Sequence, residues 1–249
     1  MTTPDSMDAK ARFLAAVERV PDRANGAERL CAACVLALPV RRAAIAISVN
    51  GHGLEVLSAT DQIAEQVEWT QVTLGEGPGF DAVASGGPVS LVSLAQADGR
   101  WPVFVPEIAG TGIGAMYALP LQVGAIRVGV LDLYCGPGEF LEGPDFADAV
   151  AVSELLTSVL LAVGPGGRIP ESLGPWWNQP PGTREVHQAT GILMEQLRID
   201  ARSAYVRLQA FAFGNRQSLR DVAGDVVGRR LRFDPDSGEA TASYPTAHP

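Results

Sequence analysis

The chain has 249 residues, of which 47% are hydrophobic and 19% charged, so it can bury an ordinary core and global disorder is excluded. Its three cysteines are too few for a disulfide scaffold, no apolar stretch approaches the roughly 20 residues that span a bilayer, and its start lacks a secretion signal. We therefore expect a cytoplasmic protein, whose net charge of −9 argues at first sight against a nucleic-acid partner.

The first half of the chain alternates between helical and β-type patterns. In chain order we predict a helix over 9–20, a helix over 26–38, strands over 42–49 and 54–57, a short helix over 61–68, a strand over 71–74, a helix over 80–85 and a strand over 89–94. Prolines 21 and 39 end the first two helices, and Asn50-Gly51 is the dipeptide that a type I′ hairpin turn favours.

The next part of the chain continues this pattern and closes with a long apolar helix. We predict a helix over 101–109, strands over 115–122 and 126–134, and a helix over 144–163. Antiparallel hairpins with helices at both ends predict an α+β domain over residues 8–163. Apolar residues cover more than one face of the last helix, so we predict a homodimer through helices 9–20 and 144–163.

A linker is predicted next, because five glycines and five prolines between residues 164 and 182 exclude a helix or strand. Residues 183–233 then show three short helical patterns with brief loops, which predicts a small all-α module. Asp200 fits the N-cap of the second helix, and Ser218 to Asp221 resembles a capping box that opens the third. Residues 234–249 are predicted to form a flexible tail.

Charge is distributed unevenly between these parts. Residues 184–232 contain nine arginines and five acidic residues, a balance of +4, which leaves −13 for the remaining chain. Such an asymmetry is expected where one segment meets phosphate groups, although a solvated helical face rich in arginine would look the same.

Within the module, the run Val186-His-Gln-Ala-Thr-Gly-Ile-Leu-Met194 is followed by Ala204-Tyr-x-x-Leu208, Ala212-x-x-Asn215 and Leu219-x-x-Val-Ala223. This pattern resembles the ANTAR domain of bacterial antitermination regulators over about 49 residues. The resemblance implies binding to paired RNA stem-loops in nascent transcripts, which prevents a terminator hairpin from forming. The candidate RNA-binding residues are Gln188, Thr190, Arg207, Asn215, Arg216, Arg220, Arg229 and Arg230.

The first domain is similar to GAF domains. The resemblance is carried by Leu74-Gly-Glu-Gly-Pro-Gly-Phe-Asp-Ala-Val-Ala-Ser-Gly-Gly-Pro-Val89, by Leu119-Pro-Leu121 and by Val128-Gly-Val-Leu-Asp-Leu133. It implies a sensor domain with an antiparallel sheet, which would bind a small molecule or serve dimerisation. A fused GAF–ANTAR arrangement resembles regulators common in actinobacteria. From position alone, the candidate lining of a ligand pocket is Phe80, Ser90, Trp101, Phe104 and Tyr117.

Gly191 lies inside the first helix of the module, where glycine costs about 1 kcal/mol against alanine. Close approach of another helix or of an RNA backbone would offset that cost, and helix packing is the favoured explanation.

Two other functional classes remain open. Three short helices also suit a DNA-binding helix-turn-helix protein. Some GAF-fold proteins reduce free methionine sulfoxide with cysteines, and Cys31, Cys34 and Cys135 are the thiols here. Cys31 and Cys34 have no second pair of ligands for zinc, so we expect no metal and no cofactor. These two cysteines lie on a predicted helix rather than around a pocket, and no acid–base constellation accompanies Cys135, so we expect no catalytic residues.

Overall fold

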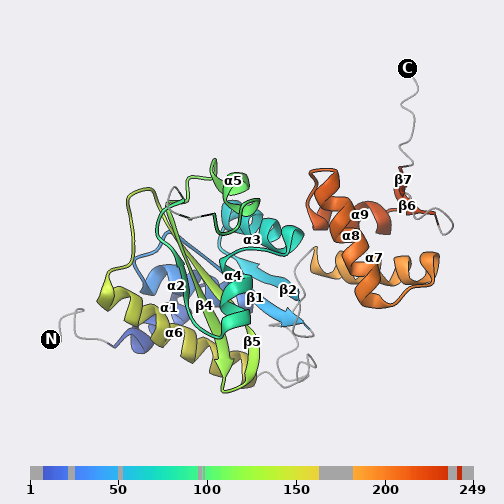
Figure 1. The fold of residues 1–249 in the computed structure, drawn as a ribbon. Coiled ribbons are helices and arrows are strands. Elements are labelled where there is room, and N and C mark those ends of the chain that lie inside the picture. Colours follow the sequence, from blue (N-terminus) through green and yellow to red (C-terminus); the bar gives the residue numbers. More distant parts are fainter. Residues whose placement is uncertain are drawn as a thin grey trace. The chain divides into compact units, whose positions relative to one another are not determined.

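The computed structural model describes residues 8–21, 26–49, 53–94, 97, 99–162, 182–234 and 240–242 (Figure 1). The chain divides into two compact units, one within residues 1–178 and the other within 179–249. The predicted Asn50-Gly51 turn and the predicted linker up to residue 181 lie outside the described residues. Among the helices that are described, none is both long and apolar enough to cross a membrane.

The first unit is built on one five-stranded sheet, in which every neighbouring pair of strands is antiparallel. Its order is β2-β1-β5-β4-β3. The strands are β1 (Arg42–Val49), β2 (Gly53–Ala59), β3 (Val89–Leu91), β4 (Ala115–Val123) and β5 (Ile126–Cys135). The central position of β5 explains why it is buried on both faces from Gly129 to Cys135, so that its apolar residues are not confined to alternate positions.

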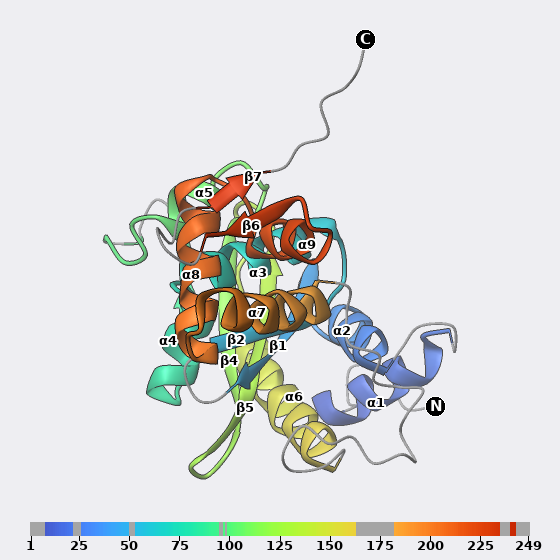
Figure 2. The ribbon, with the colours of Figure 1, turned by 90° about the vertical axis from the view of Figure 1, so that its right-hand side faces the viewer.

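Helices cover both faces of this sheet (Figures 1 and 2). One face packs against α1 (Ala9–Arg19), α2 (Gly26–Ala37) and α6 (Gly143–Ala162), and this layer contains the main hydrophobic core. The other face carries α3 (Gln62–Leu74), α4 (Pro78–Ser85) and the short α5 (Phe104–Ile108). The predicted fold class, an antiparallel sheet flanked by helices and followed by a small helical module, is confirmed.

Alternation along β5 sends successive side chains to the two layers. Leu131 and Leu133 join the core beneath α1, α2 and α6, while Asp132 points to the layer of α3 and accepts a hydrogen bond from Gln71 Nε2 at 3.1 Å. Tyr134 follows Asp132 on that side and donates its hydroxyl proton to Glu68. Four polar side chains are therefore buried together between α3 and the sheet.

Burial raises the pKa of both carboxyl groups in this cluster, Glu68 and Asp132, because the charged forms lose their hydration. The negative charge of Glu68 raises the pKa of Asp132 further. Each carboxyl group keeps one buried oxygen, Glu68 Oε2 and Asp132 Oδ1, without a hydrogen-bond partner in the described part of the chain.

The glycine-rich segment 75–79 passes directly over this cluster. A Cβ atom at Gly77 would lie 2.4 Å from Gln71 Oε1, and one at Gly79 would lie 3.0 Å from Asp132 Oδ2. The backbone N–H of Gly79 donates to Gln71 Oε1 at 2.9 Å. These glycines thus allow the start of α4 to approach a buried polar core, which is a structural reason for their presence.

The strand predicted over residues 71–74 is wrong, because α3 continues through it to Leu74. The β-branched residues Val72 and Thr73 favour a strand locally, but Val67, Val72 and their buried neighbours pack against the sheet as one helical face. Gly75 then ends the helix with a left-handed φ of 65°.

The second unit contains α7 (Thr183–Leu197), α8 (Ala201–Gly214) and α9 (Leu219–Val227), as the sequence predicts, followed by β6 (Leu231–Phe233) and β7 (Ala240–Ala242). The sequence does not predict the pair β6–β7, and β7 falls inside the segment predicted as a flexible tail. Phe233 holds β6 against the helices by two contacts. Its ring packs edge-on against that of Phe211, with the ring centroids 5.4 Å apart, and its backbone N–H donates to Gln196 Oε1 at 3.3 Å.

Candidate nucleic-acid interface

Local hydrogen bonds set the starts of α8 and α9 in the second unit. Asp200 Oδ1 accepts from the N–H of Ser203 at 3.0 Å, so Asp200 is the N-cap of α8. Ser218 Oγ accepts from the N–H of Asp221 at 3.1 Å and donates to its carboxylate at 2.7 Å, which caps α9. Both caps agree with the sequence prediction.

A small apolar core joins the three helices. The fully buried residues are Ala189, Leu193, Ala204, Leu208, Ala212, Leu219, Val222 and Ala223. Most of the spacing in the ANTAR-like pattern is therefore explained by packing. Any interface must use the residues between these positions.

Three arginines adopt an unusual backbone conformation at the helix ends. Arg198 is the C-cap of α7, and Arg216 and Arg229 follow the C-caps of α8 and α9. Their φ angles are 54°, 54° and 58°, in a left-handed region that side chains other than glycine seldom adopt. All three are exposed, and a guanidinium at a helix C-terminus meets the negative end of the helix dipole.

Two other candidate arginines lie together against acidic residues. Arg220 and Arg230 line a small pocket of about 260 Å³ with Glu185, Asp221 and Asp225. Arg230 Nε is 2.7 Å from Asp225 Oδ1. The pKa of Glu185 is lowered, first by the N–H of Gly182 and then by nearby arginines that include Arg220. Acidic groups thus compete with phosphate for Arg220 and Arg230.

The two candidates on α7 do not share a face. Consecutive helical positions are about 100° apart, so Gln188 and Thr190 point in nearly opposite directions. Gln188 is exposed, whereas Thr190 is half-buried and donates its hydroxyl proton to the carbonyl of Val186 at 2.7 Å. Of the pair, only Gln188 presents a polar group that can reach a base from outside.

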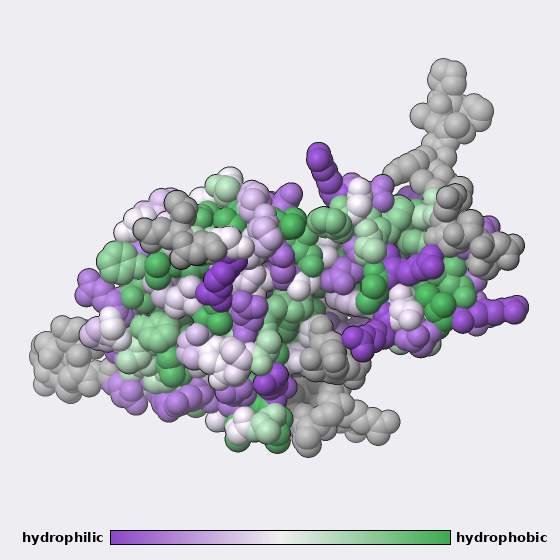
Figure 3. Space-filling view, in the orientation of Figure 1, coloured by the Kyte–Doolittle hydropathy of each residue, from purple (hydrophilic) through white to green (hydrophobic). Residues whose placement is uncertain are grey.

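The loop after α8 presents Asn215 and Arg216 side by side, and both are exposed. Asn215 Nδ2 donates to the carbonyl of Phe211 at 2.9 Å, which leaves its Oδ1 as the outward acceptor. Arg207 is also exposed, but lies in the middle of α8. On the face shown in Figure 3, strongly hydrophilic residues project from this unit with hydrophobic residues between them.

Packing against another helix within the described part of this chain does not explain Gly191. A Cβ atom at this position would meet no atom within 4 Å. Gly191 instead lies on the exposed side of α7, one turn beyond Gln188.

The five residues predicted to line a ligand pocket in the first unit do not form one cluster, although Ser90 on β3 is paired directly with Tyr117 on β4. Tyr117 lies in the core beneath α6, where its ring is 6.0 Å from Phe146 and its hydroxyl accepts from the N–H of Leu141. Trp101 and Phe104 are buried in the other layer, and Trp101 Nε1 donates to Asp81 Oδ2 at 3.2 Å. Phe80 is half-buried on α4, and Ser90 is exposed on the edge strand β3.

Sequence reasoning missed Arg198, which shares the left-handed geometry of Arg216 and Arg229. Its position directly before Ile199-Asp200, between two helical patterns, is the signal that marks a helix end. The sequence also does not predict the pair of Asp225 and Arg230. Residues five apart do not face each other on a continuous helix, and the two meet only because α9 ends at Val227, between them.

Comparison with known proteins identifies residues 182–227 as a match to the ANTAR domain family. The GAF domain of a phosphoenolpyruvate-protein phosphotransferase from Coxiella burnetii is similar at 14% identity, over 62% of this chain and 92% of that chain, with a TM-score of 0.49. The corresponding GAF domain from Acinetobacter is similar at 12% identity, over 68% of this chain and 100% of that chain, with a TM-score of 0.48. No protein of curated function matches this chain.

Proposed function

We propose that this chain is a signal-responsive transcription antitermination regulator, which binds RNA stem-loops through its second unit under the control of the first. The observation that carries the proposal is the ANTAR match over residues 182–227. The surplus of arginine between residues 184 and 232 supports it, since RNA binding needs cationic contacts to phosphate.

The arginines divide into two groups with different expected contributions. Arg216 and Arg229 are exposed, and no acidic partner contacts them in the described residues, so their guanidinium groups can bind phosphate directly. Arg230 is held by Asp225, so part of its charge is already balanced. Gln188 and the Oδ1 atom of Asn215 are the groups best placed to read bases in a loop.

The test is binding of the full chain to a paired RNA hairpin, measured by fluorescence anisotropy at several salt concentrations. Arg216→Ala and Arg229→Ala should each weaken binding to any hairpin and reduce the salt dependence by about one charge. Arg230→Ala is the matched control and should change both quantities less. Unchanged affinity in the double variant Arg216→Ala/Arg229→Ala would remove this surface from the proposal.

Base reading has a separate signature. Gln188→Ala or Asn215→Ala should cost about 1–3 kcal/mol for the preferred loop, by analogy with bidentate contacts to DNA bases, and little for a scrambled loop. Competition with duplex DNA at fixed salt tests the helix-turn-helix alternative. Tighter binding to the duplex than to every hairpin would favour DNA as the partner.

The thiol-dependent alternative has less support. All three cysteines are buried, and burial raises the pKa of Cys31 to about 12 and that of Cys135 to about 11, while that of Cys34 is raised well above its ordinary value. Reduction of a sulfoxide needs a thiolate nucleophile, and these environments disfavour the thiolate. A reductase assay on the wild type and on Cys135→Ser tests this alternative directly.

Dimerisation through α1 and α6 is part of the same proposal. Lys10 pairs with Glu154 at 3.0 Å and Arg12 with Asp148 at 2.5 Å, so the two helices form one continuous surface. Leu14 is 51% exposed on this surface. Light scattering at tens of micromolar protein, on the order of a typical assay, should give a dimer, and Leu14→Glu should shift it toward the monomer.

A further inference from the structure

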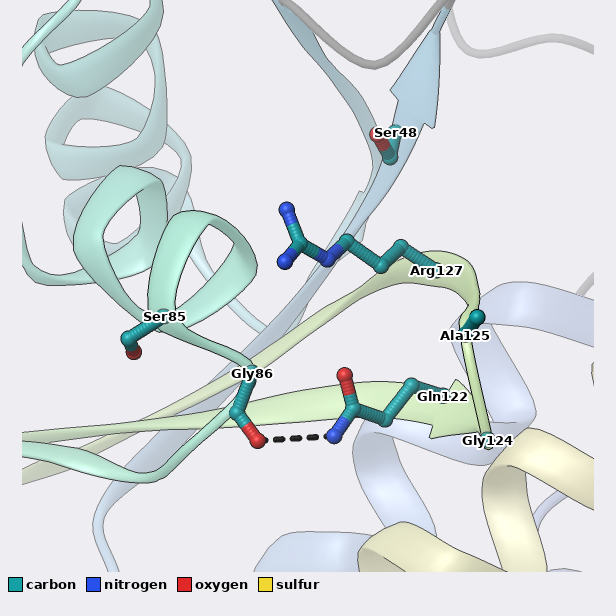
Figure 4. Close-up of a pocket in the computed structure, with 7 residues that line it drawn as sticks. All are labelled: Ser48, Ser85, Gly86, Gln122, Gly124, Ala125 and Arg127. Carbon is teal, nitrogen blue, oxygen red and sulfur yellow. Dashed lines mark hydrogen bonds between the residues drawn. The ribbon is translucent and has the colours of Figure 1, made fainter.

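A polar pocket opens at the end of the sheet where β4 turns into β5 (Figure 4). Its volume is about 600 Å³, within the range of roughly 300–1,000 Å³ that small-molecule sites occupy. The lining residues are Ser48, Ser85, Gly86, Gln122, Gly124, Ala125 and Arg127. Arg127 is the one charged residue among them, so the pocket is cationic although its domain is acidic.

A β-bulge directs Arg127 into this pocket. Leu121 pairs with Gly129, but the register shifts after Leu121 and Gln122 pairs with Arg127. Without the shift, the alternation that buries Leu131 beneath α6 would direct Arg127 to that same layer. The bulge instead turns Arg127 toward α4, and its guanidinium lies between the strands and Ser85 in Figure 4.

Each polar group of the pocket offers a defined part of a binding site. Arg127 has no acidic partner in the described part of the chain, so its N–H groups can bind an oxyanion in two-point fashion. Gln122 Nε2 donates to the carbonyl of Gly86 at 2.7 Å, which fixes the amide and leaves Oε1 as a free acceptor. The hydroxyl of Ser48 can donate or accept. Ser85 is already engaged, since its hydroxyl donates to the carbonyl of Asp81 at 2.7 Å.

We infer that this pocket binds a small hydroxylated oxyanion, with Arg127 on its phosphate or carboxylate and Gln122 Oε1 and Ser48 on its hydroxyl groups. The ligand needs both an anionic group and a hydroxyl group, because the anionic group binds the guanidinium of Arg127 and only a hydroxyl donor satisfies the acceptor Gln122 Oε1. All of its lining residues belong to the first unit and none belongs to the predicted aromatic set, so the inference does not rest on the proposed RNA binding.

Titration of the full chain at constant ionic strength tests this inference. The probes are glycerol 3-phosphate, D-glycerate, inorganic phosphate and glycerol, and binding is followed in ¹H–¹⁵N spectra at the side-chain signals of Arg127 and Gln122. One of the two hydroxylated anions should saturate these signals, and comparison of the two identifies phosphate or carboxylate as the preferred group. Glycerol, which has no anionic group, and inorganic phosphate, which has no alcohol hydroxyl groups, should bind more weakly.

Arg127→Gln should weaken binding of the preferred anion about tenfold or more, because a charge-assisted pair of hydrogen bonds is lost. Ser48→Ala should weaken it about fivefold, as expected for one neutral hydrogen bond. Arg19→Gln is the matched control, since it removes one exposed arginine of the same unit from α1, and it should leave binding unchanged. Absence of saturation by both anions, or equal affinity in Arg127→Gln and the wild type, would overturn the inference.

Discussion

Replacement of Gly191 by alanine should stabilise the second unit, although this glycine belongs to the run that resembles the ANTAR pattern. The Cβ atom of alanine would meet nothing within 4 Å, so the substitution creates no clash. Gly191 lies in the interior of α7, where alanine is favoured over glycine by about 1 kcal/mol. The expected result is a gain of about that size in the free energy of unfolding of α7.

Hydrogen exchange followed by mass spectrometry measures this gain on peptides from α7 in the full chain. A stabilisation of about 1 kcal/mol should slow exchange of the protected amides about fivefold. Gly224→Ala in α9 is the matched control, because a Cβ atom there also meets no neighbour and the helical gain should be similar. Exchange from α7 that is faster than in the wild type would refute the reasoning, since it would show that another part of the molecule contacts Gly191.

The same variant separates packing from binding. If RNA or a second chain approaches the bare backbone at Gly191, Gly191→Ala should lower RNA affinity while the unit becomes more stable. Gly224→Ala should leave the affinity unchanged. Equal affinities in the wild type and both variants would place the contact surface elsewhere on the unit.

Three further predictions concern stability. Glu68 and Asp132 have raised pKa values in the fold, so above about pH 4 the folded state binds more protons than the unfolded state, and the free energy of unfolding should fall as pH rises toward neutral. In urea titrations followed by tryptophan fluorescence, Asp132→Asn should make this fall less steep. An unchanged slope would contradict the raised pKa of Asp132. Leu208→Ala should cost about 2–5 kcal/mol, because Leu208 is fully buried, and thermal circular dichroism should show early loss of helix, whereas an unchanged transition would disprove its core position. Ser218→Ala removes the N-cap of α9 and should cost about 1 kcal/mol, seen as faster exchange in α9 but not in α8.

Several features of the protein follow from local sequence alone. The hairpin strands β4 and β5 and the helices α7 to α9 are predicted within a few residues, because side-chain periodicity and N-cap residues act over a few neighbouring positions. Asp200 and Ser218 show this most directly, since each caps the helix that its own position predicts. The arginine-rich character of the second unit is likewise a property of the sequence, because it needs only a count of charges along the chain.

Other features depend on which distant segments meet. The local preference of residues 71–74 for a strand is outweighed by the burial of α3 against the sheet. The register of β4 in the sheet decides on which face Tyr117 lies. It packs in the core beneath α6, whereas Phe104 lies on the other side of the sheet, with α3.

The electrostatic and binding properties of single side chains are decided in the same way. The register shift between Leu121 and Gln122 directs the side chain of Arg127 into a pocket. The end of α9 brings the guanidinium of Arg230 to the carboxylate of Asp225. A sequence determines which residues each helix and strand presents, because those preferences are local. Which presented groups are buried, paired or left free depends on contacts between segments far apart in the chain, and only the tertiary structure decides them.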